Sequence, residues 1–507
     1  MSPISILFLV LGYFAILLLI AKITGKNDSN ETFFTGNRNS PWFVVAFGMI
    51  GASLSGVTFI SVPGWVADSK FAYMQMVLGY FAGYVVIAHI LLPLYYRLNL
   101  TSIYTYLRDR FGNSTYKTGA VFFLISRIIG ASFRLFLVAN VLQLAVFDAL
   151  GVPFAATVFG TILLIWVYTF RGGIRTIVYT DTLQTLFMLL AVGLTVYYLS
   201  DAIIPEGTSL VDYISSHPDS QVWFFGEEKG GFWTSLVNGA SSQHFLKQFL
   251  GGMFITICMT GLDQDMMQKN LTCRSLKDAQ KNMYGFSISL IFVNLLFLSL
   301  GILLYDYAGQ MGIDAANDDL YPAIALSEGL PAVVTVFFII GLIASAYSSA
   351  DSALTSLTTS FSVDILEIDT SSSEVDAKSL RRKVHIGMSL VIFIVIILFK
   401  YTAPKNVIND LFRVATYTYG PLLGLYAFGL MNKRRVRDQF VPFAAVASPT
   451  LAYIMYENSE KWFNYTFGFE LLLLNGGFMM LMLWLLSLGD VGKPRLTSLP
   501  LDKGVMD

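Results

Sequence analysis

Residues 345–359 read SAYSSADSALTSLTT and lie inside a segment, 332–365, that is otherwise apolar enough to sit in lipid. Steps of three and four residues, at about 100° each, return to the same side of an α-helix, so the hydroxyl side chains of this stretch share one face. Asp351 lies only about 60° from Ser348 around the same helix. The hydroxyl-bearing residues on this face are Ser345, Ser348, Ser349, Ser352, Thr355, Ser356 and Thr359.

This hydroxyl face predicts a functional interior. Polar atoms at membrane depth have no water to satisfy them, so the face must contact protein, an internal aqueous cavity or an ion. Oxygen donors without thiol or imidazole neighbours suit a hard cation. The stretch therefore favours an ion-handling membrane protein.

The composition of the whole chain agrees with a membrane location. Its 507 residues are 55% hydrophobic and 13% charged, against about 25% charged in soluble proteins. We expect an all-α polytopic membrane protein with about thirteen transmembrane helices. The predicted spans are 4–21, 42–66, 73–96, 119–147, 154–170, 177–199, 242–262, 283–305, 332–365, 385–399, 407–430, 440–455 and 465–488.

Basic residues predict the orientation of these spans. Most of the 33 Lys and Arg residues fall in alternate loops, beginning with the loop after the first span, and include the runs 381–383 and 433–435. Basic loops stay on the cytoplasmic side, so the N-terminus is expected outside and the C-terminus inside. Span 4–21 lacks a basic n-region and a small-residue cleavage site, which predicts a retained helix. Without a long outside segment, a bacterial inner membrane is the expected location.

Several function classes are disfavoured by what the sequence lacks. Cys258 and Cys273 are predicted in a span and in a cytoplasmic loop, so a disulfide is not expected, and no metal-ligand cluster is present. The phosphate-binding motif Gly-x-x-x-x-Gly-Lys-[Ser/Thr] is absent, so an ion gradient is a better energy source than ATP. No serine has an evident histidine base, and we predict that the protein is not an enzyme.

A second informative stretch, residues 51–58, reads GASLSGVT and precedes Pro63-Gly64 within the second span. Discontinuous helices near the midplane are typical of transporter binding sites, because unwound backbone frees carbonyl oxygens for a cation. The alternative is a seam of small residues for helix packing. Asp181, at the cytoplasmic end of the sixth span, adds a carboxylate that is costly in lipid without a cation, or else caps the helix.

Together these segments resemble the sodium/solute symporter family. Residues 172–184, from Gly172-Gly173 to Gln184, are similar to one family signature. The run DQDMMQK at 263–269, followed by SLKDA at 275–279, is similar to another. The helix with Ser348-Ser349 that ends in SVDI at 362–365 resembles a third.

This resemblance runs from about Leu11 to Met431 and implies a leucine-transporter-like fold. It would contain two inverted five-helix repeats, here 42–199 and 242–430, in a single transporter domain covering 1–507. One additional helix, 4–21, would precede the repeats and two, within 440–488, would follow them.

The resemblance also implies positions for sodium. The first site would use backbone carbonyls of Gly51, Leu54 and Ser345 with the hydroxyls of Ser348 and Ser349. A second site, found in some members, would involve Asp181, Ser348, Asp351 and Ser352. Asp351 replaces the Ser or Thr of those members, and the added carboxylate either strengthens sodium binding or makes the site protonatable.

The solute is suggested by local similarity. Residues 54–59, LSGVTF, are similar to the sialic-acid-transporting bacterial members, which place an Arg where Arg134 stands. Arg can hold a carboxylate through two charge-assisted hydrogen bonds; the alternatives are a buried ion pair or a snorkelling side chain. The predicted substrate-binding residues are Ser55, Thr58, Gln75 and Arg134, and the alternative for Gln75 is that it caps its helix.

The sequence thus predicts a sodium-coupled secondary active importer that works by alternating access on a small organic solute, with a sialic acid or other carboxylated sugar favoured. The alternatives are a proton-coupled symporter, a symporter of a neutral sugar, an amino acid or a monocarboxylate, an intramembrane enzyme and a sensor module. The expected partners are the solute, one or two Na⁺ ions and membrane lipid, without nucleic acid or an obligate protein partner.

Overall fold

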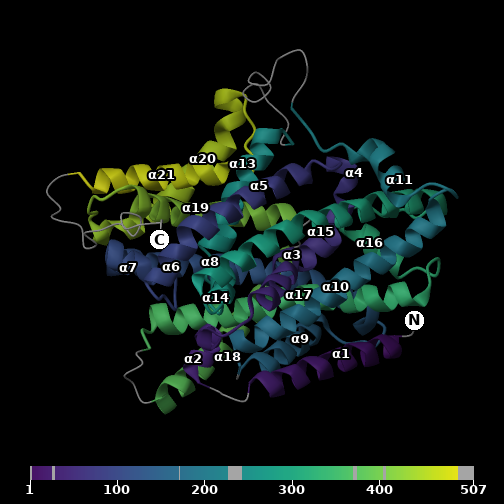
Figure 1. The fold of residues 1–507 in the computed structure, drawn as a ribbon, viewed down its shortest axis with the longest axis horizontal. Helices are drawn as coiled ribbons and strands as arrows, with labels where there is room; N and C mark the ends of the chain where they lie inside the picture. Colours follow the sequence, from purple (N-terminus) through teal and green to yellow (C-terminus); the bar gives the residue numbers. More distant parts are fainter. Residues whose placement is uncertain are drawn as a thin grey trace.

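The computed structural model describes residues 3–25, 29–170, 172–225, 243–368, 374–402 and 407–488, and within these ranges the chain is helical with no strand longer than one isolated bridge. Long helices cross the molecule side by side (Figure 1). They are α1 (Pro3–Thr24), α3 (Trp42–Gly64), α5 (Tyr73–Val86), α8 (Asn113–Leu142), α9 (Phe154–Thr169), α10 (Ile174–Ile203), α13 (Phe245–Thr256), α15 (Leu276–Met311), α17 (Ala332–Ser360), α18 (Glu374–Thr402), α19 (Val407–Met431), α20 (Val441–Phe463) and α21 (Leu471–Leu486).

Shorter elements extend or connect these helices. The π-helical turns continue their neighbours, so that η7 carries α17 on to Ile365. The short α-helices are α2 (Asn30–Thr35), α4 (Val66–Ser69), α6 (Leu92–Arg97), α7 (Thr105–Arg110), α11 (Leu210–Ser216), α14 (Gln264–Asn270) and α16 (Leu320–Ala325). The π-helical turns are η2 (Ile87–Leu91), η3 (Gln143–Phe147), η5 (Ile257–Gly261) and η7 (Phe361–Ile365). The 3-10 turns are η1 (Gly36–Arg38), η4 (Pro218–Ser220), η6 (Asn317–Asp319) and η8 (Asp438–Phe440).

Seven helices in the described ranges are long and apolar enough to cross a membrane, and the number rises to nine if each of two bent helix pairs is one span. This confirms an all-helical integral membrane protein. The predicted spans 154–170 and 465–488 correspond to the shorter apolar helices α9 and α21. Spans 407–430 and 440–455 correspond to α19 and α20, which do not pass the same test. The total of thirteen spans stays a prediction.

Helix α17, which carries the hydroxyl face, lies in the middle of the molecule beside α3 and α10 (Figure 1). Every residue from Phe338 to Ser360 is buried. An all-round buried helix can carry polar groups on any side, provided that neighbouring helices supply partners. The hydroxyl face therefore meets protein rather than lipid, as its composition predicts.

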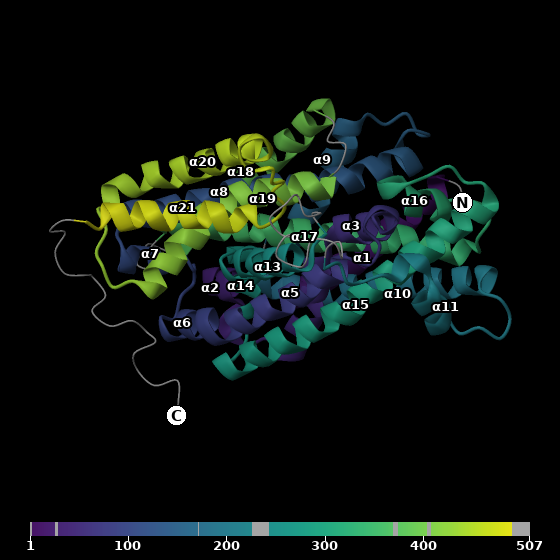
Figure 2. The ribbon, with the colours of Figure 1, turned by 90° about the horizontal axis from the view of Figure 1, so that it is seen from above.

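The periphery of the molecule is different. Helix α1 lies along one edge (Figure 1) and exposes apolar side chains such as Phe8 and Leu19. Helices α19, α20 and α21 pack together on another side (Figure 2). Apolar residues that are exposed on outer helices are suited to lipid contact. Most of the predicted site residues, by contrast, lie on the inner helices α3, α8, α10 and α17, and α14 contacts α3, α10 and α17.

Candidate functional site

Helix α3 is broken at the predicted place. Ser55 has φ 46° and ψ 169°, and the two halves, Trp42–Gly56 and Thr58–Gly64, meet at 59°. A positive φ at a residue other than glycine is a strained conformation that persists only where its surroundings enforce it. Because the turn-to-turn hydrogen-bond ladder cannot continue through such a break, backbone carbonyls before it become available to a ligand.

Gly51, in the turn before the break, allows α3 to approach α10 closely. A Cβ atom at this position would lie 2.4 Å from Oγ1 of Thr185. The backbone N–H of Gly51 donates a hydrogen bond of 3.0 Å to that same oxygen. Both helices are therefore held in register beside the broken segment.

The other half of the predicted first sodium site lies on α17 and meets α3 directly. Ser349 Oγ lies 3.4 Å from the carbonyl oxygen of Ala52 and 3.5 Å from that of Ser345. The hydroxyl of Ser345 donates to the carbonyl of Leu342, whereas the predicted ligand of this residue is its backbone carbonyl. Helices α3 and α17, which carry the predicted ligands, thus meet at the contact between Ser349 and Ala52. All five are buried: Gly51, Leu54, Ser345, Ser348 and Ser349.

Asp181 is fully engaged by two other helices. Its Oδ2 accepts a bond of 2.6 Å from Nζ of Lys269 on α14, and its Oδ1 accepts one of 2.8 Å from Oγ of Ser348 on α17. Asp181 is 0% exposed and Lys269 1%. The sequence analysis found the carboxylate and the serine but not the lysine, although Lys269 closes the DQDMMQK motif. Lys269 is predicted there in a cytoplasmic loop, and only the 70° bend between η5 and α14 brings it inward.

Asp351 interacts electrostatically with Asp181 and Lys269, but its hydrogen bonds are made to other groups. Its Oδ2 accepts a 2.7 Å hydrogen bond from the hydroxyl of Tyr168 on α9, and its Oδ1 accepts one from the backbone N–H of Ser352. Within the described ranges it forms no ion pair. The hydroxyl groups of Ser352 and Thr355 are buried and have no hydrogen-bond partner among the residues described. Hydrogen bonds thus pair Asp181 with Ser348 and Asp351 with its chain neighbour Ser352, and the two carboxyl groups interact electrostatically.

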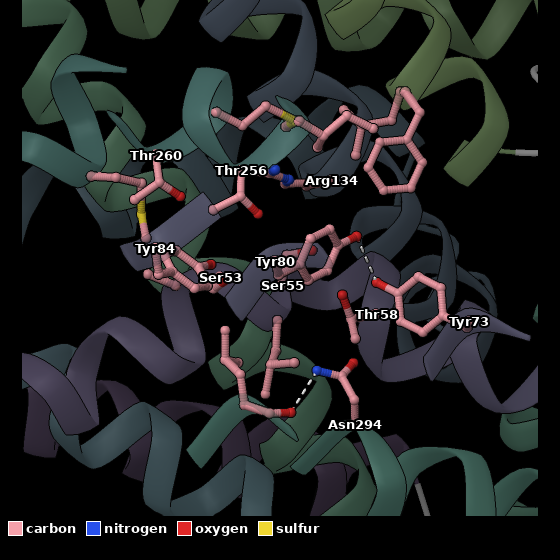
Figure 3. A pocket seen from close by; sticks show the side chains of 18 of the residues that line it. Ser53, Ser55, Thr58, Tyr73, Tyr80, Tyr84, Arg134, Thr256, Thr260 and Asn294 are labelled. Atoms are coloured by element: carbon pink, nitrogen blue, oxygen red, sulfur yellow. Dashed lines mark hydrogen bonds between the residues drawn. The ribbon is translucent and has the colours of Figure 1, made fainter. Parts of the chain in front are cut away.

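A cavity of about 90 Å³ lies beside the break in α3 (Figure 3). Helices α3, α5, α8, α15 and α19 contribute to its wall, together with α13 and η5. Three of the four predicted substrate residues line it, namely Ser55, Thr58 and Arg134. Its other labelled polar residues are Ser53, Tyr73, Tyr80, Tyr84, Thr256, Thr260 and Asn294.

Arg134 is an arginine of this cavity that forms no ion pair with a described residue. It is 6% exposed, and its Nε has no hydrogen-bond partner among the described residues. The neighbouring Arg127, by contrast, pairs with Asp263 and Asp265. Of the two arginines, the alternative of a buried ion pair therefore fits Arg127, whereas Arg134 is available to an anion that enters the cavity.

Gln75 does not line this cavity. Its Nε2 donates to the carbonyls of Ala72 and Gln243, and its Oε1 accepts from the backbone N–H of Phe224. These bonds join the start of α5 to the segments before α13 and after η4. Because the amide is used in this way, Gln75 has a structural role here rather than the substrate contact expected from sequence.

None of the seven other labelled polar residues of the cavity was predicted from sequence as a substrate residue, and three of them form notable contacts. The hydroxyls of Tyr73 and Tyr80 lie 3.2 Å apart and form a hydrogen bond at its wall. Asn294 donates to the carbonyl of Leu290, and its Oδ1 is buried without a partner among the described residues. Asn294 carried a usable signal, because it is an amide in the middle of the apolar span 283–305.

The chain is similar in sequence to known sodium-coupled transporters. The human sodium/iodide cotransporter is 24% identical over 83% of this chain and 65% of its own length, so the chain spans somewhat less than two thirds of that relative. A sodium/sialic acid symporter of Aliivibrio fischeri is 23% identical over 91% of this chain and 88% of its own. Both are transporters, not enzymes.

The fold is also found among solved structures. The substrate-bound, outward-open structure of a Na⁺-coupled sialic acid symporter superimposes with a TM-score of 0.78, covers 97% of this chain and 99% of that one, and is 18% identical. The two chains therefore share a fold. The sequence model described as "Sodium:solute symporter family" matches residues 33–438, most of the chain. On this evidence the chain belongs to the sodium:solute symporter family.

Proposed function

We propose that this protein is a sodium-coupled secondary active importer of a small organic solute that carries a carboxylate. The observation that carries the proposal is the break in α3 at Ser55, which contacts the hydroxyl face of α17 on one side and lines the cavity with Arg134 on the other. An ion and a solute bound at one broken helix would each stabilise the same helix arrangement, which is the requirement for coupling.

The ion site of this proposal lies between α3 and α17. Carbonyl oxygens of Gly51, Leu54 and Ser345, with the hydroxyls of Ser348 and Ser349, form a set of hard, uncharged donors that suits Na⁺. Ser348 gives its hydrogen to Asp181 and keeps its lone pairs for a cation. Sodium entering down its gradient would favour the outward-open state, and rocking of one helix group against the other would then expose both ligands inside.

The solute site is the cavity next to Ser55 and Thr58, with Arg134 as the carboxylate-binding group. A sialic acid or other carboxylated sugar is the favoured solute, supported by the similarity to the Aliivibrio fischeri symporter. A monocarboxylate, an amino acid and a neutral sugar are the alternatives. A neutral sugar has no negative group that could pair with the guanidinium of Arg134.

The proposed topology has thirteen spans in a single transporter domain, 1–507. Two inverted repeats, 42–199 and 242–430, follow helix 4–21 and precede two helices in 440–488. The N-terminus would lie outside and the C-terminus inside a bacterial inner membrane. Lipid would contact the exposed apolar faces of outer helices such as α1.

The proposal is tested by transport into proteoliposomes that contain the purified protein. An inward Na⁺ gradient should drive accumulation of labelled N-acetylneuraminic acid or of a smaller carboxylate, and replacing Na⁺ with choline should abolish it. A thermal-shift screen of acidic and neutral solutes with and without Na⁺ identifies the solute first, since a bound ligand stabilises the folded state. Accumulation that is equally strong without Na⁺ would contradict sodium coupling.

Proton coupling is a second candidate because of Asp351, a buried carboxylate without an ion pair in the described ranges. A proton carried on this group would allow uptake in sodium-free buffer with an inward proton gradient. Collapse of that uptake with a protonophore, together with indifference to Na⁺, would favour this alternative over sodium coupling.

A further inference from the structure

We propose that Lys269 is a built-in counter-cation for Asp181, so that this carboxylate needs no sodium ion of its own. This inference rests on the proposed sodium coupling and specifies its ion count. Lys269 sets the number of coupling ions to one, bound between α3 and α17, because its ammonium group replaces the second ion that Asp181 would otherwise attract.

The geometry of the pair supports this role. Nζ of Lys269 lies 2.6 Å from Oδ2 of Asp181, and Ser348 occupies the other carboxylate oxygen at 2.8 Å. Both oxygens of Asp181 are thus engaged by donors that belong to the chain. A sodium ion at the same carboxylate would lie within a few ångströms of the ammonium charge, where the repulsion between two like charges opposes its binding.

Because Asp181 is buried, its carboxylate requires a positively charged partner. The side chains of Asp181 and Lys269 are each 1% exposed. An isolated buried charge is far more costly than a compensated one, so Asp181 must hold either the lysine or another cation. The lysine is tethered to α14 and is therefore present at high local concentration whatever the sodium concentration is.

One other charged group nearby, Asp351, also interacts electrostatically with Lys269 but forms no hydrogen bond with it. The carboxylate of Asp351 is held by the hydroxyl of Tyr168 and by a backbone N–H, not by Lys269. Asp263 and Asp265 are paired with Arg127. Within the part of the chain that the structure describes, the ammonium group thus makes its hydrogen bond and its ion pair with Asp181.

The pair also joins parts of the chain that are distant in sequence. Asp181 lies on α10, in the predicted first repeat, whereas Lys269 on α14 and Ser348 on α17 lie in the predicted second repeat. Ser348 connects the pair to the proposed ion site, because its oxygen serves both. A sodium ion at the α3–α17 site would therefore be separated from the carboxylate of Asp181 by one hydroxyl group and would interact with its charge.

The test counts bound sodium. Equilibrium binding of ²²Na⁺ to purified, monodisperse protein should give about one ion per chain for the wild type. In Lys269→Met the carboxylate loses its counter-cation and should recruit a second ion. The double variant Lys269→Met/Asp181→Asn carries neither charge and should return to one ion, and Lys269→Arg, which keeps the charge, should also bind one.

Opposite results would overturn the inference. Two ions on the wild type and one on the double variant would make Asp181 a sodium ligand, with Lys269 displaced when the ion binds. An unchanged count of one in Lys269→Met would show that the lysine does not control occupancy. If Lys269→Met does not fold, Lys269→Gln takes its place, because its amide can still donate to Asp181 without a charge, and it should bind two ions; a count of one would overturn the inference. Failure of the proposed function is distinct: the wild type would bind no sodium and show no sodium-dependent uptake.

Discussion

Ser348 connects three features of the site, since it lies on α17, donates to Asp181 and belongs to the proposed ion site. Removing its hydroxyl in Ser348→Ala takes away one oxygen ligand of the cation. We expect the sodium concentration for half-maximal uptake to rise about tenfold, which corresponds to about 1.4 kcal/mol. Ser356→Ala is the matched control, because Ser356 lies buried on the same helix but donates only to the carbonyl of Ala353. An unchanged sodium dependence in Ser348→Ala would remove this residue from the site.

Arg134 should determine selectivity for acidic solutes. Arg134→Lys keeps a positive charge but loses the planar fork, and Arg134→Gln loses the charge. A hydrogen bond to a charged group is worth about 1.5 to 3 kcal/mol, so Arg134→Gln should weaken binding of an acidic solute by about tenfold to hundredfold. Arg134→Lys should retain part of the affinity. Thermal-shift titrations measure both, and an equal loss for neutral solutes would count against carboxylate recognition.

At this scale the sequence identified most of the polar groups but not their partners. Ser348, Asp181 and Arg134 are recognisable because polar residues in apolar spans need an explanation. Lys269 is 88 positions from Asp181 and lies outside any predicted span, so only the folded chain reveals their contact. Gln75 is a substrate candidate in sequence, but in the structure its amide is hydrogen-bonded to the backbone of Gln243 and Phe224.

Among the elements, the contact between α3 and α10 depends on the absence of a side chain at Gly51. A methyl group there would meet Thr185 Oγ1 at 2.4 Å. Gly51→Ala should destabilise the protein by about 1 to 3 kcal/mol, the usual cost of overpacking, and should weaken sodium binding because the carbonyl of residue 51 shifts.

Gly193→Ala on α10 is a suitable control for Gly51→Ala, since nothing lies within 4 Å of a Cβ atom at that position. Thermal unfolding with and without Na⁺ measures both effects. If the two variants melt at the same temperature, the close approach of α3 and α10 does not contribute measurably to the free energy of unfolding.

Helix positions followed from the sequence better than helix ends did. The predicted span 332–365 matches α17 with η7, and 154–170 matches α9. The predicted span 385–399 is only part of α18, which begins at Glu374, because a helix can continue beyond lipid through charged residues that hydropathy excludes. Likewise, the bend after η5 and the inward direction of α14 result from tertiary packing, and the hydropathy of the sequence does not predict them.

For the molecule as a whole, the ion count decides how the membrane voltage acts. One Na⁺ transported with one carboxylate carries no net charge, so a membrane potential would supply no energy. A second Na⁺ would add one charge, worth about 2.3 kcal/mol per 100 mV, or about fiftyfold in accumulation. The structure with Lys269 on Asp181 therefore predicts electroneutral uptake of an acidic solute.

This expectation can be measured in proteoliposomes with a potassium diffusion potential of about −100 mV set by valinomycin. Accumulation of the acidic solute should follow the sodium concentration gradient and should not change with the potential. Lys269→Met, which is expected to bind a second ion, should become voltage-sensitive if it transports. Strong voltage dependence in the wild type would indicate that more than one cation accompanies each anion.

The complete burial of α17 from Phe338 to Ser360 has a consequence for how this helix tolerates sequence change. Outer helices such as α1, with exposed apolar side chains on part of their surface, should accept substitutions with a helical periodicity. In α17 every direction is occupied by other helices, so the periodicity should disappear. A saturation mutagenesis profile of residues 338–360 should be uniformly intolerant, with small residues preferred at most positions and no side on which bulk is accepted.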